Sequence, residues 1–172
     1  MNVRMVDLPE ITVIGKMGLN TREHPAAPAL WAEANSHFGE VAALGKRGED
    51  GNYTGFWGAM SDTGLRFLPW EDGFTRGLYL AGVEAESGAE APEGWTRWVL
   101  PARRWLVAEV EQDRYGEVFT QVIREVIPGL GLRLSGAACD FIEPATGKTE
   151  LYFPVQAEEE RRADPSPRAA EA

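Results

Sequence analysis

The stretch GAMSD at residues 58–62 recurs as GAACD at residues 136–140, an offset of 78 (136 − 58). Each copy combines small residues with one aspartate and lies in or beside an apolar segment that favours a β-strand. Recurrence of a motif along one chain is typical of an internal duplication. The motif therefore predicts that the chain contains two related halves.

Two further motifs recur in the same order on either side of this one. Leu-Pro at 8–9 returns at 100–101, an offset of 92, and LYLAGV at 78–83 resembles LYFPV at 151–155, an offset of 73. One helical segment falls between the first and second motif of each half. The chain is therefore predicted to be an α+β domain built from two strand-helix-strand-strand repeats.

Apolar spacing predicts two main helices. Residues 113–127 repeat apolar side chains at helical spacing, with Asp113 as a candidate cap and Pro128-Gly129 as the end, and residues 28–44 form the second segment. The predicted strands are residues 3–6, 11–19, 55–60, 78–84, 96–100, 105–110, 138–142 and 150–155.

The two halves differ in length, and the chain ends in a polar tail. The domain is predicted to span residues 1–156, with half-repeats of about 1–90 and 91–156, and the charged, proline-containing residues 157–172 are expected to be disordered. The first half has a longer connection at residues 63–77. That segment is interpreted either as a lid or as a longer surface loop.

Composition narrows the classes of partner. Of the 172 residues, 17 are Lys or Arg and 27 are Asp or Glu, a formal net charge of −10. Direct nucleic-acid binding is disfavoured because phosphates would be repelled, while cationic ligands are favoured. Solubility alone would also account for the acidity.

The chain carries a single cysteine, Cys139, so no intramolecular disulfide can form. It has no apolar run long enough to span a membrane and no basic-then-apolar leader, so a cytoplasmic location is expected. The two histidines, His24 and His37, form no ligand pair with each other or with Cys139, and no glycine-rich phosphate loop follows a strand. We expect no metal and no cofactor.

Aromatic side chains stand out, since six residues are tryptophan. Core filling is the ordinary use of each one, but together they favour a cleft that stacks on planar or cationic molecules. An acid among them would select positive charge. Glu150 shares a strand face with Tyr152, and Glu84 ends the corresponding strand beyond Tyr79; exposed strand-end charges are the alternative interpretation of both glutamates.

Several stretches together resemble the GyrI-like family, the effector-binding domain that is also attached to AraC-type and MerR-type regulators; they are LPEITVIG, WGAMSD, GLYLAGVE, PEGWTRWVLPA and GKTELYFPV. The resemblance covers about residues 3–156 and is to the stand-alone form. It implies two pseudo-symmetric repeats that form a curved antiparallel sheet with two main helices. It also implies a central cleft that takes hydrophobic, often cationic, small molecules.

In that family an E-x-aromatic-x-P pattern on the last strand commonly supplies an acid at the pocket floor, and residues 150–154 match it. The resemblance thus implies Glu150 as the floor, Tyr152 as its companion and Tyr79 as the counterpart in the first half. At the offset of 73, Gly77 stands where the second half has Glu150, so a single acid is expected. The full predicted lining is Glu150, Tyr152, Tyr79, Trp31, Trp57, Met60, Trp70, Glu84 and Trp105.

The first hypothesis for function is a stand-alone protein that binds hydrophobic, cationic small molecules in an aromatic, acid-floored cleft. The resemblance leaves a second, a hydrolase that opens cyclopropane rings of genotoxic molecules, with Glu150 as the catalytic residue. A third is an inhibitor that binds a protein such as DNA gyrase. A transcription factor is disfavoured because only a few residues precede the first predicted strand.

Overall fold

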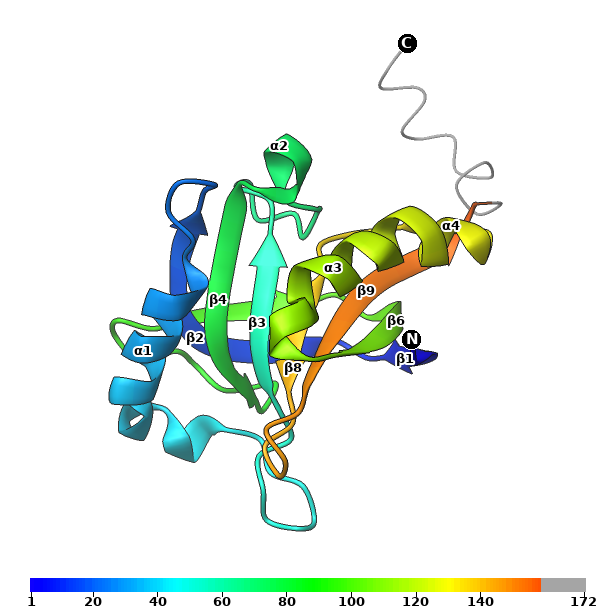
Figure 1. Cartoon of the computed structure of the whole chain (residues 1–172). Helices are drawn as coiled ribbons and strands as arrows, with labels where there is room; N and C mark the ends of the chain where they lie inside the picture. The colour runs from blue at the N-terminus through cyan, green and yellow to red at the C-terminus, as the bar shows by residue number, and fades with distance from the viewer. Residues whose placement is uncertain (159–172) are drawn as a thin grey trace, which may run out of the picture.

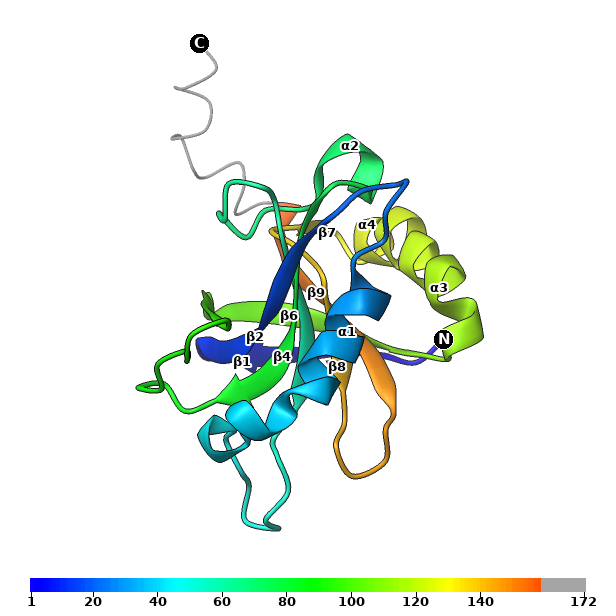
Figure 2. The same cartoon turned by 90° about the vertical axis from the view of Figure 1, so that its left-hand side faces the viewer.

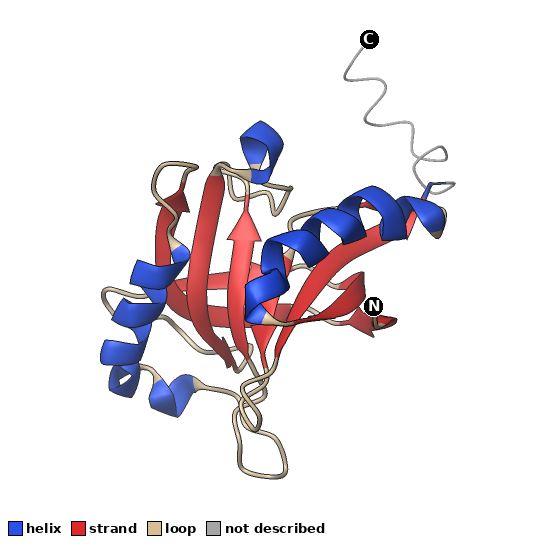
Figure 3. Cartoon of the chain, in the orientation of Figure 1, coloured by secondary structure: helices blue, strands red, loops and turns tan. Residues whose placement is uncertain are grey.

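The computed structural model describes residues 1–158, so the predicted tail lies outside the described residues except for its first two positions. Within this part of the chain, nine strands form one sheet with a few helices, which confirms the predicted α+β class. Figure 1 shows the sheet with α1 and α3 in front of it, and Figure 3 shows the same arrangement by secondary structure.

Each half follows the predicted strand-helix-strand-strand order, preceded by one further strand. The first half consists of β1 (Val3–Leu8), β2 (Ile11–Asn20), α1 (Ala27–Ser36), β3 (Phe56–Ser61) and β4 (Gly77–Ala85). The second consists of β5 (Thr96–Leu100), β6 (Arg103–Val110), α3 (Tyr115–Gln121), β8 (Cys139–Ile142) and β9 (Thr149–Ala157). Two short elements have no sequence prediction: α2 (Glu71–Phe74) and β7 (Leu132–Leu134).

The order of strands across the sheet is symmetric about its middle. It runs β1-β6-β9-β8-β3-β4-β2-β5, so the halves meet between β8 and β3, and each outer strand pairs with the other half. Leu8 pairs with Arg103, and Leu100 pairs with Ile11. Adding 92 to Leu8 and to Ile11 turns one pair into the other, which supports the offset predicted for this motif.

The register corrects the third motif by one residue. Ser61 pairs with Leu78, and Cys139, which lies 78 residues after Ser61, pairs with Tyr152. The counterpart of Leu78 is therefore Tyr152, an offset of 74 and not 73. Because neighbouring side chains of a strand point to opposite faces, this slip moves every assigned counterpart to the wrong face. Tyr79 corresponds to Phe153, and its predicted match with Tyr152 is wrong.

Both predicted helices exist, with changes at their ends. The first was expected over residues 28–44, but α1 ends at Ser36 and continues as two short 3₁₀ turns, because Asn35, Ser36 and Gly39 favour helix weakly. The second runs from a 3₁₀ turn at Gln112–Arg114 through α3 and a π-helical turn at Val122–Val126 to α4 (Ile127–Gly129). The side chain of Asp113 makes none of the predicted capping hydrogen bonds.

The two helices cover the same face of the sheet, as the side view in Figure 2 also shows. Leu30 and Ala34 of α1 pack on the first half, and Val118 and Val122 pack on the second. We call this the helix face. Its two apolar clusters are separate, and the middle of the helix face, between α1 and α3, belongs to neither cluster.

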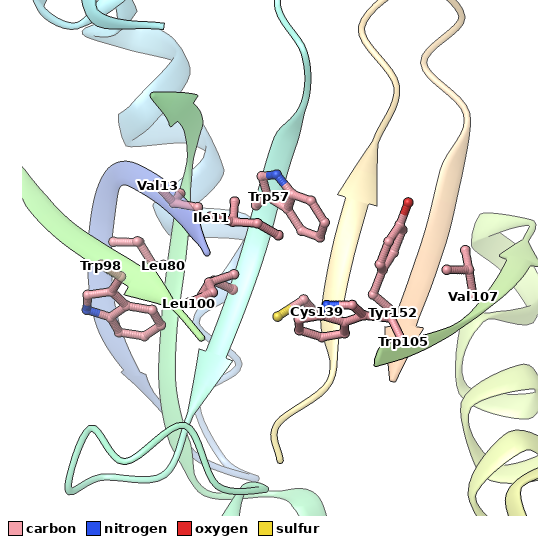
Figure 4. Packing of buried hydrophobic residues seen from close by; sticks show 11 residues of the cluster. Ile11, Val13, Trp57, Leu80, Trp98, Leu100, Trp105, Val107, Cys139 and Tyr152 are labelled. Atoms are coloured by element: carbon pink, nitrogen blue, oxygen red, sulfur yellow. The ribbon is translucent and has the colours of Figure 1, made fainter. Parts of the chain in front are cut away.

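The opposite face, which we call the back face, has one continuous core across both halves (Figure 4). The strands β2 and β6 pass behind the central strands in Figure 1, so the curved sheet encloses its own back face. Trp57 and Tyr152 meet there at the junction, with ring centroids 5.0 Å apart, and Trp105 lies next to Tyr152 at 6.0 Å. Burial of such large rings supplies much of the hydrophobic stabilisation of the fold.

Candidate functional site

A pocket of about 530 Å³ lies on the helix face between α1 and α3. We call it the central pocket. Both halves line it, and among the described residues of its lining there is no lysine or arginine. The members that carry its chemistry are Trp31, Met60, Trp70 and Tyr79 from the first half and Tyr115 and Asp140 from the second.

The carboxylate of Asp140 is the polar centre of the central pocket. The Tyr79 hydroxyl donates to its Oδ2 at 2.8 Å, and the Tyr115 hydroxyl donates to its Oδ1 at 2.5 Å. The indole of Trp31 in turn donates to the Tyr79 oxygen at 2.9 Å. A chain of hydrogen bonds therefore connects α1, the central strands and α3 through one acid.

Gly58 on β3 allows this chain to form. Tyr79 lies on β4 and Asp140 on β8, so the tyrosine side chain has to cross the strand between them. A Cβ atom at position 58 would lie 1.9 Å from the Tyr79 hydroxyl and 2.9 Å from Asp140 Oδ2. Only glycine fits beneath this hydrogen bond, which explains one glycine of the repeated motif.

The acid is surrounded by protein but keeps partial contact with solvent through the pocket. Burial raises the pKa of the Asp140 carboxyl to about 6, although the two phenol hydrogen bonds act in the opposite direction. Burial, and next the neighbouring Asp140, raise the pKa of Tyr79 and of Tyr115 well above the ordinary value. Both phenols therefore stay protonated as donors, while Asp140 changes charge near neutral pH.

Aromatic side chains form the walls around the acid. Trp70 lies 6.5 Å from Tyr79 between ring centroids, and its indole donates to the Leu78 carbonyl at 3.0 Å. Gly77 gives it room, because a Cβ there would lie 2.0 Å from the Trp70 ring. The Asn20 side chain closes the end of the pocket by binding both Thr75 and Ala26 backbone groups.

The residues predicted to line one cleft lie on two faces of the sheet. The structure brings Trp31, Met60, Trp70 and Tyr79 together in the central pocket. The register places the other five predicted residues on the back face; they are Trp57, Glu84, Trp105, Glu150 and Tyr152. The alternation of side chains along each strand separates the two groups.

Glu150 is buried beside Tyr152 as expected, but it faces away from Tyr79. Its carboxylate forms an ion pair with Arg4 of β1 at 2.5 Å and accepts two hydrogen bonds from that guanidinium. Glu84, also on the back face, accepts a hydrogen bond from the Trp57 indole at 2.9 Å. Each predicted acid therefore already has a partner within the fold.

Sequence reasoning missed Asp140 and Tyr115 as pocket residues. A signal for Asp140 existed, because it ends the repeated GAACD motif at residues 136–140. Its counterpart at the offset of 78 is Asp62, which accepts hydrogen bonds from the backbone of Gly64, Arg66 and Leu68. The repeated aspartate thus holds a loop together in the first half, and it lines the central pocket in the second half.

That loop belongs to the longer connection predicted at residues 63–77. It carries Trp70 into the central pocket, and Phe74 packs edge-on against Phe119 of α3 with ring centroids 5.8 Å apart. The connection therefore forms one wall of the site. Its interpretation as a lid or as a longer surface loop stays a prediction.

Two further observations concern other kinds of site. Within residues 1–158, no group of three or more His, Cys, Asp or Glu residues is arranged to hold a metal ion. No helix in the described part of the chain is long and apolar enough to cross a membrane.

Solved structures share this fold. SAV2435 in complex with tetraphenylphosphonium has a TM-score of 0.65 at 14% identity, covering 93% of this chain and 97% of that one. The C-terminal domain of EcmrR has a TM-score of 0.58 at 12% identity, with 91% and 98% covered. A putative transcription regulation protein from Staphylococcus aureus MU50 has a TM-score of 0.59 at 16% identity, with 91% and 99% covered.

These likenesses confirm the predicted fold. No family model matches the chain. No curated protein matches it either. Membership of the GyrI-like family therefore stays a prediction from the sequence motifs.

Proposed function

We propose that the chain is a small-molecule-binding protein whose central pocket takes hydrophobic organic cations. The observation that carries the proposal is Asp140, a deeply placed carboxylate whose two partners are neutral phenols. A buried charge is costly without a cation, and the described lining supplies none. A positively charged ligand would provide the missing partner.

The walls of the central pocket favour the same ligand class. Trp31, Trp70 and the two tyrosines present aromatic surface around Asp140, and aromatic faces attract cations. A volume of about 530 Å³ lies in the range of pockets that hold small organic molecules. The fold likeness to SAV2435, whose structure contains tetraphenylphosphonium, supports the choice of that cation as a probe.

The test is titration of the protein with tetraphenylphosphonium at pH 8, followed by tryptophan fluorescence. Asp140→Asn keeps the shape of the acid and removes its charge, so we expect affinity to fall roughly 30-fold, in the range found for loss of one partner of a buried charge pair. Glu150→Gln is the matched control, because it removes one carboxylate on the back face. We expect its affinity to stay within about twofold of the parent.

Two results would contradict the proposal: saturable binding that is equally weakened by both substitutions, or binding that neither of them changes. Circular dichroism and thermal unfolding of both variants would show that the fold is retained. Absence of binding to a panel of planar and tetrahedral cations would reject the ligand class.

For the alternative hypothesis of a hydrolase, we propose Asp140 as the catalytic residue in place of Glu150, because Asp140 lies in the central pocket. A carboxyl with a pKa of about 6 exchanges protons readily near neutral pH, and the Tyr115 hydroxyl is held beside it at 2.5 Å. Incubation with a cyclopropane-containing genotoxin and mass spectrometry would test this second candidate. A water-addition product that disappears in Asp140→Asn would support it, and no product after many equivalents of protein would remove it for this substrate class.

A further inference from the structure

A second hollow of about 460 Å³ lies next to the central pocket. We call it the α3 groove. Met60, Trp70 and Tyr115 line both hollows, so the two are neighbours that share one wall. The groove runs along α3 and is closed on its other side by the α2 segment, which lies at the same end of the sheet in Figures 1 and 2.

The near part of the α3 groove is apolar. Phe119 comes from α3, Ile123 comes from the π-helical turn that follows it, and Phe74 comes from α2. Gly116, on the first turn of α3, also lines the groove and is exposed, and a Cβ atom there would meet nothing within 4 Å. A larger side chain at position 116 would therefore extend into open space along the groove.

The far end of the α3 groove carries a positive charge. Arg124 is exposed there, and it forms no ion pair with any described residue. It lies in the π-helical turn Val122–Val126, and such turns occur often at functional sites. From Tyr115, which binds Asp140, Arg124 is nine residues along the helix, which corresponds to roughly 13 Å.

We propose that the α3 groove is a second subsite, and that the ligand is an elongated molecule with a cationic head, an apolar chain and an anionic end. The head binds at Asp140, the chain lies along Phe119 and Ile123, and the anionic end pairs with Arg124. The opposite charges at the two ends set the polarity of the ligand, and the helical rise of roughly 13 Å from Tyr115 to Arg124 sets the scale of its length. This inference rests on the proposed function of the central pocket.

The first experiment measures chain length. Butyl-, octyl- and dodecyl-trimethylammonium are titrated by calorimetry below their micelle concentrations. Affinity should rise roughly three- to fourfold for each methylene group that the groove buries. In Gly116→Leu, whose side chain fills the near part of the groove, the gain from butyl to dodecyl should fall at least roughly tenfold, while butyl-trimethylammonium binds as in the parent. Helix propensity favours leucine over glycine, so this variant is expected to fold.

The second experiment measures the anionic end. A dodecyl-trimethylammonium with a terminal carboxylate should bind the parent more tightly than the uncharged chain does, and Arg124→Gln should lower its affinity roughly fivefold without changing that of the uncharged chain. The matched control is Arg97→Gln, which removes an equal charge on β5 at the edge of the sheet.

The outcomes separate the two proposals. If butyl-trimethylammonium binds and depends on Asp140, but affinity is independent of chain length or is unchanged in Gly116→Leu, the second subsite is rejected and the central pocket stands. If chain length matters but Arg124→Gln has no effect on the carboxylate probe, the anionic end is rejected. If none of the cations binds, both proposals fall.

Discussion

The junction between the halves is filled on the back face of the sheet and hollow on the helix face. On the back face, Trp57, Phe141 and Tyr152 fill the junction, with ring centroids between 4.8 and 5.5 Å apart. On the helix face, a hollow of about 530 Å³ remains above the same strands, with Asp140 and Tyr79 at its floor. Consecutive residues of one strand, Asp140 and Phe141, therefore belong to an aromatic pocket with an acid at its floor and to an apolar core.

Because successive side chains of a strand point to opposite faces, alternate residues of the same strand can serve stability and ligand binding separately. Acids on the back face are already paired within the fold, as Glu150 is with Arg4. The acid on the helix face has only phenols as partners. Substitutions on the back face should thus alter stability, and substitutions on the helix face should alter ligand affinity.

The largest expected effect is the loss of a tryptophan from the back face. Trp57 is 2% exposed, so Trp57→Ala should lower the free energy of unfolding by about 3–5 kcal/mol, the usual cost of a cavity of that size. Trp31 lines the central pocket and is only partly buried, so Trp31→Ala should cost about 1 kcal/mol and should weaken cation binding. Urea unfolding gives both values, and equal costs for the two variants would contradict the division between faces.

A smaller effect is expected from the charge of Asp140, and it depends on pH. The folded-state pKa of about 6 lies above the ordinary carboxyl value of 3.8, so the group favours folding below pH 4 and this contribution is lost as pH rises through 6. A shift of about two units corresponds to about 3 kcal/mol. Asp140→Asn should therefore be more stable than the parent at pH 8 by up to about 3 kcal/mol.

The ligand should show the opposite dependence on pH. A cation binds the ionised carboxylate, so affinity should rise between pH 5 and 7 and level off above 7, while the unliganded protein loses stability over the same interval. Urea unfolding and fluorescence titration across this range measure the two trends. A flat affinity profile together with a flat difference between parent and Asp140→Asn would show that Asp140 keeps one protonation state throughout.

The smallest effect is expected at Glu150. Arg4 is about half exposed, so the ion pair with Glu150 is partly screened, and Glu150→Gln should lower the free energy of unfolding by about 1 kcal/mol. The effect should shrink in high salt because screening weakens the pair further. If Glu150→Gln weakens the free energy of ligand binding by more than it lowers the free energy of unfolding, Glu150 would have to take part in binding.

Much of the fold could be predicted because its signals are local. The two helices and eight of the strands follow from apolar spacing, and the two related halves follow from motifs that recur in sequence; the order of the strands across the sheet comes from the structure. The short α2 and β7 were missed, because β7 has only three residues and α2 contains Asp72 and Phe74 in left-handed backbone conformations that no local pattern requires.

The candidate site was harder to predict, because the face on which each side chain lies depends on register. Aligning Tyr79 with Tyr152 in place of Phe153 is a one-residue error in sequence but a change of face in space. This error placed Glu150 and Tyr79 in the same predicted cleft, although they lie on opposite faces, and it gave Asp140 no role. Tyr115 lies in the helix predicted over residues 113–127, but its hydroxyl contact with Asp140 is a long-range pairing that spacing does not reveal.

The repeated aspartate has a consequence for how the two halves can change over time. Asp62 is held by its loop, where backbone hydrogen bonds keep its pKa below the ordinary value although burial opposes them. Its copy, Asp140, has no loop to maintain. In this chain, Asp62 therefore serves the fold, whereas Asp140 is available to a ligand in the central pocket. Substitutions at Asp62 should therefore be constrained by folding in any relative with this loop, while the residue at position 140 can vary with the ligand.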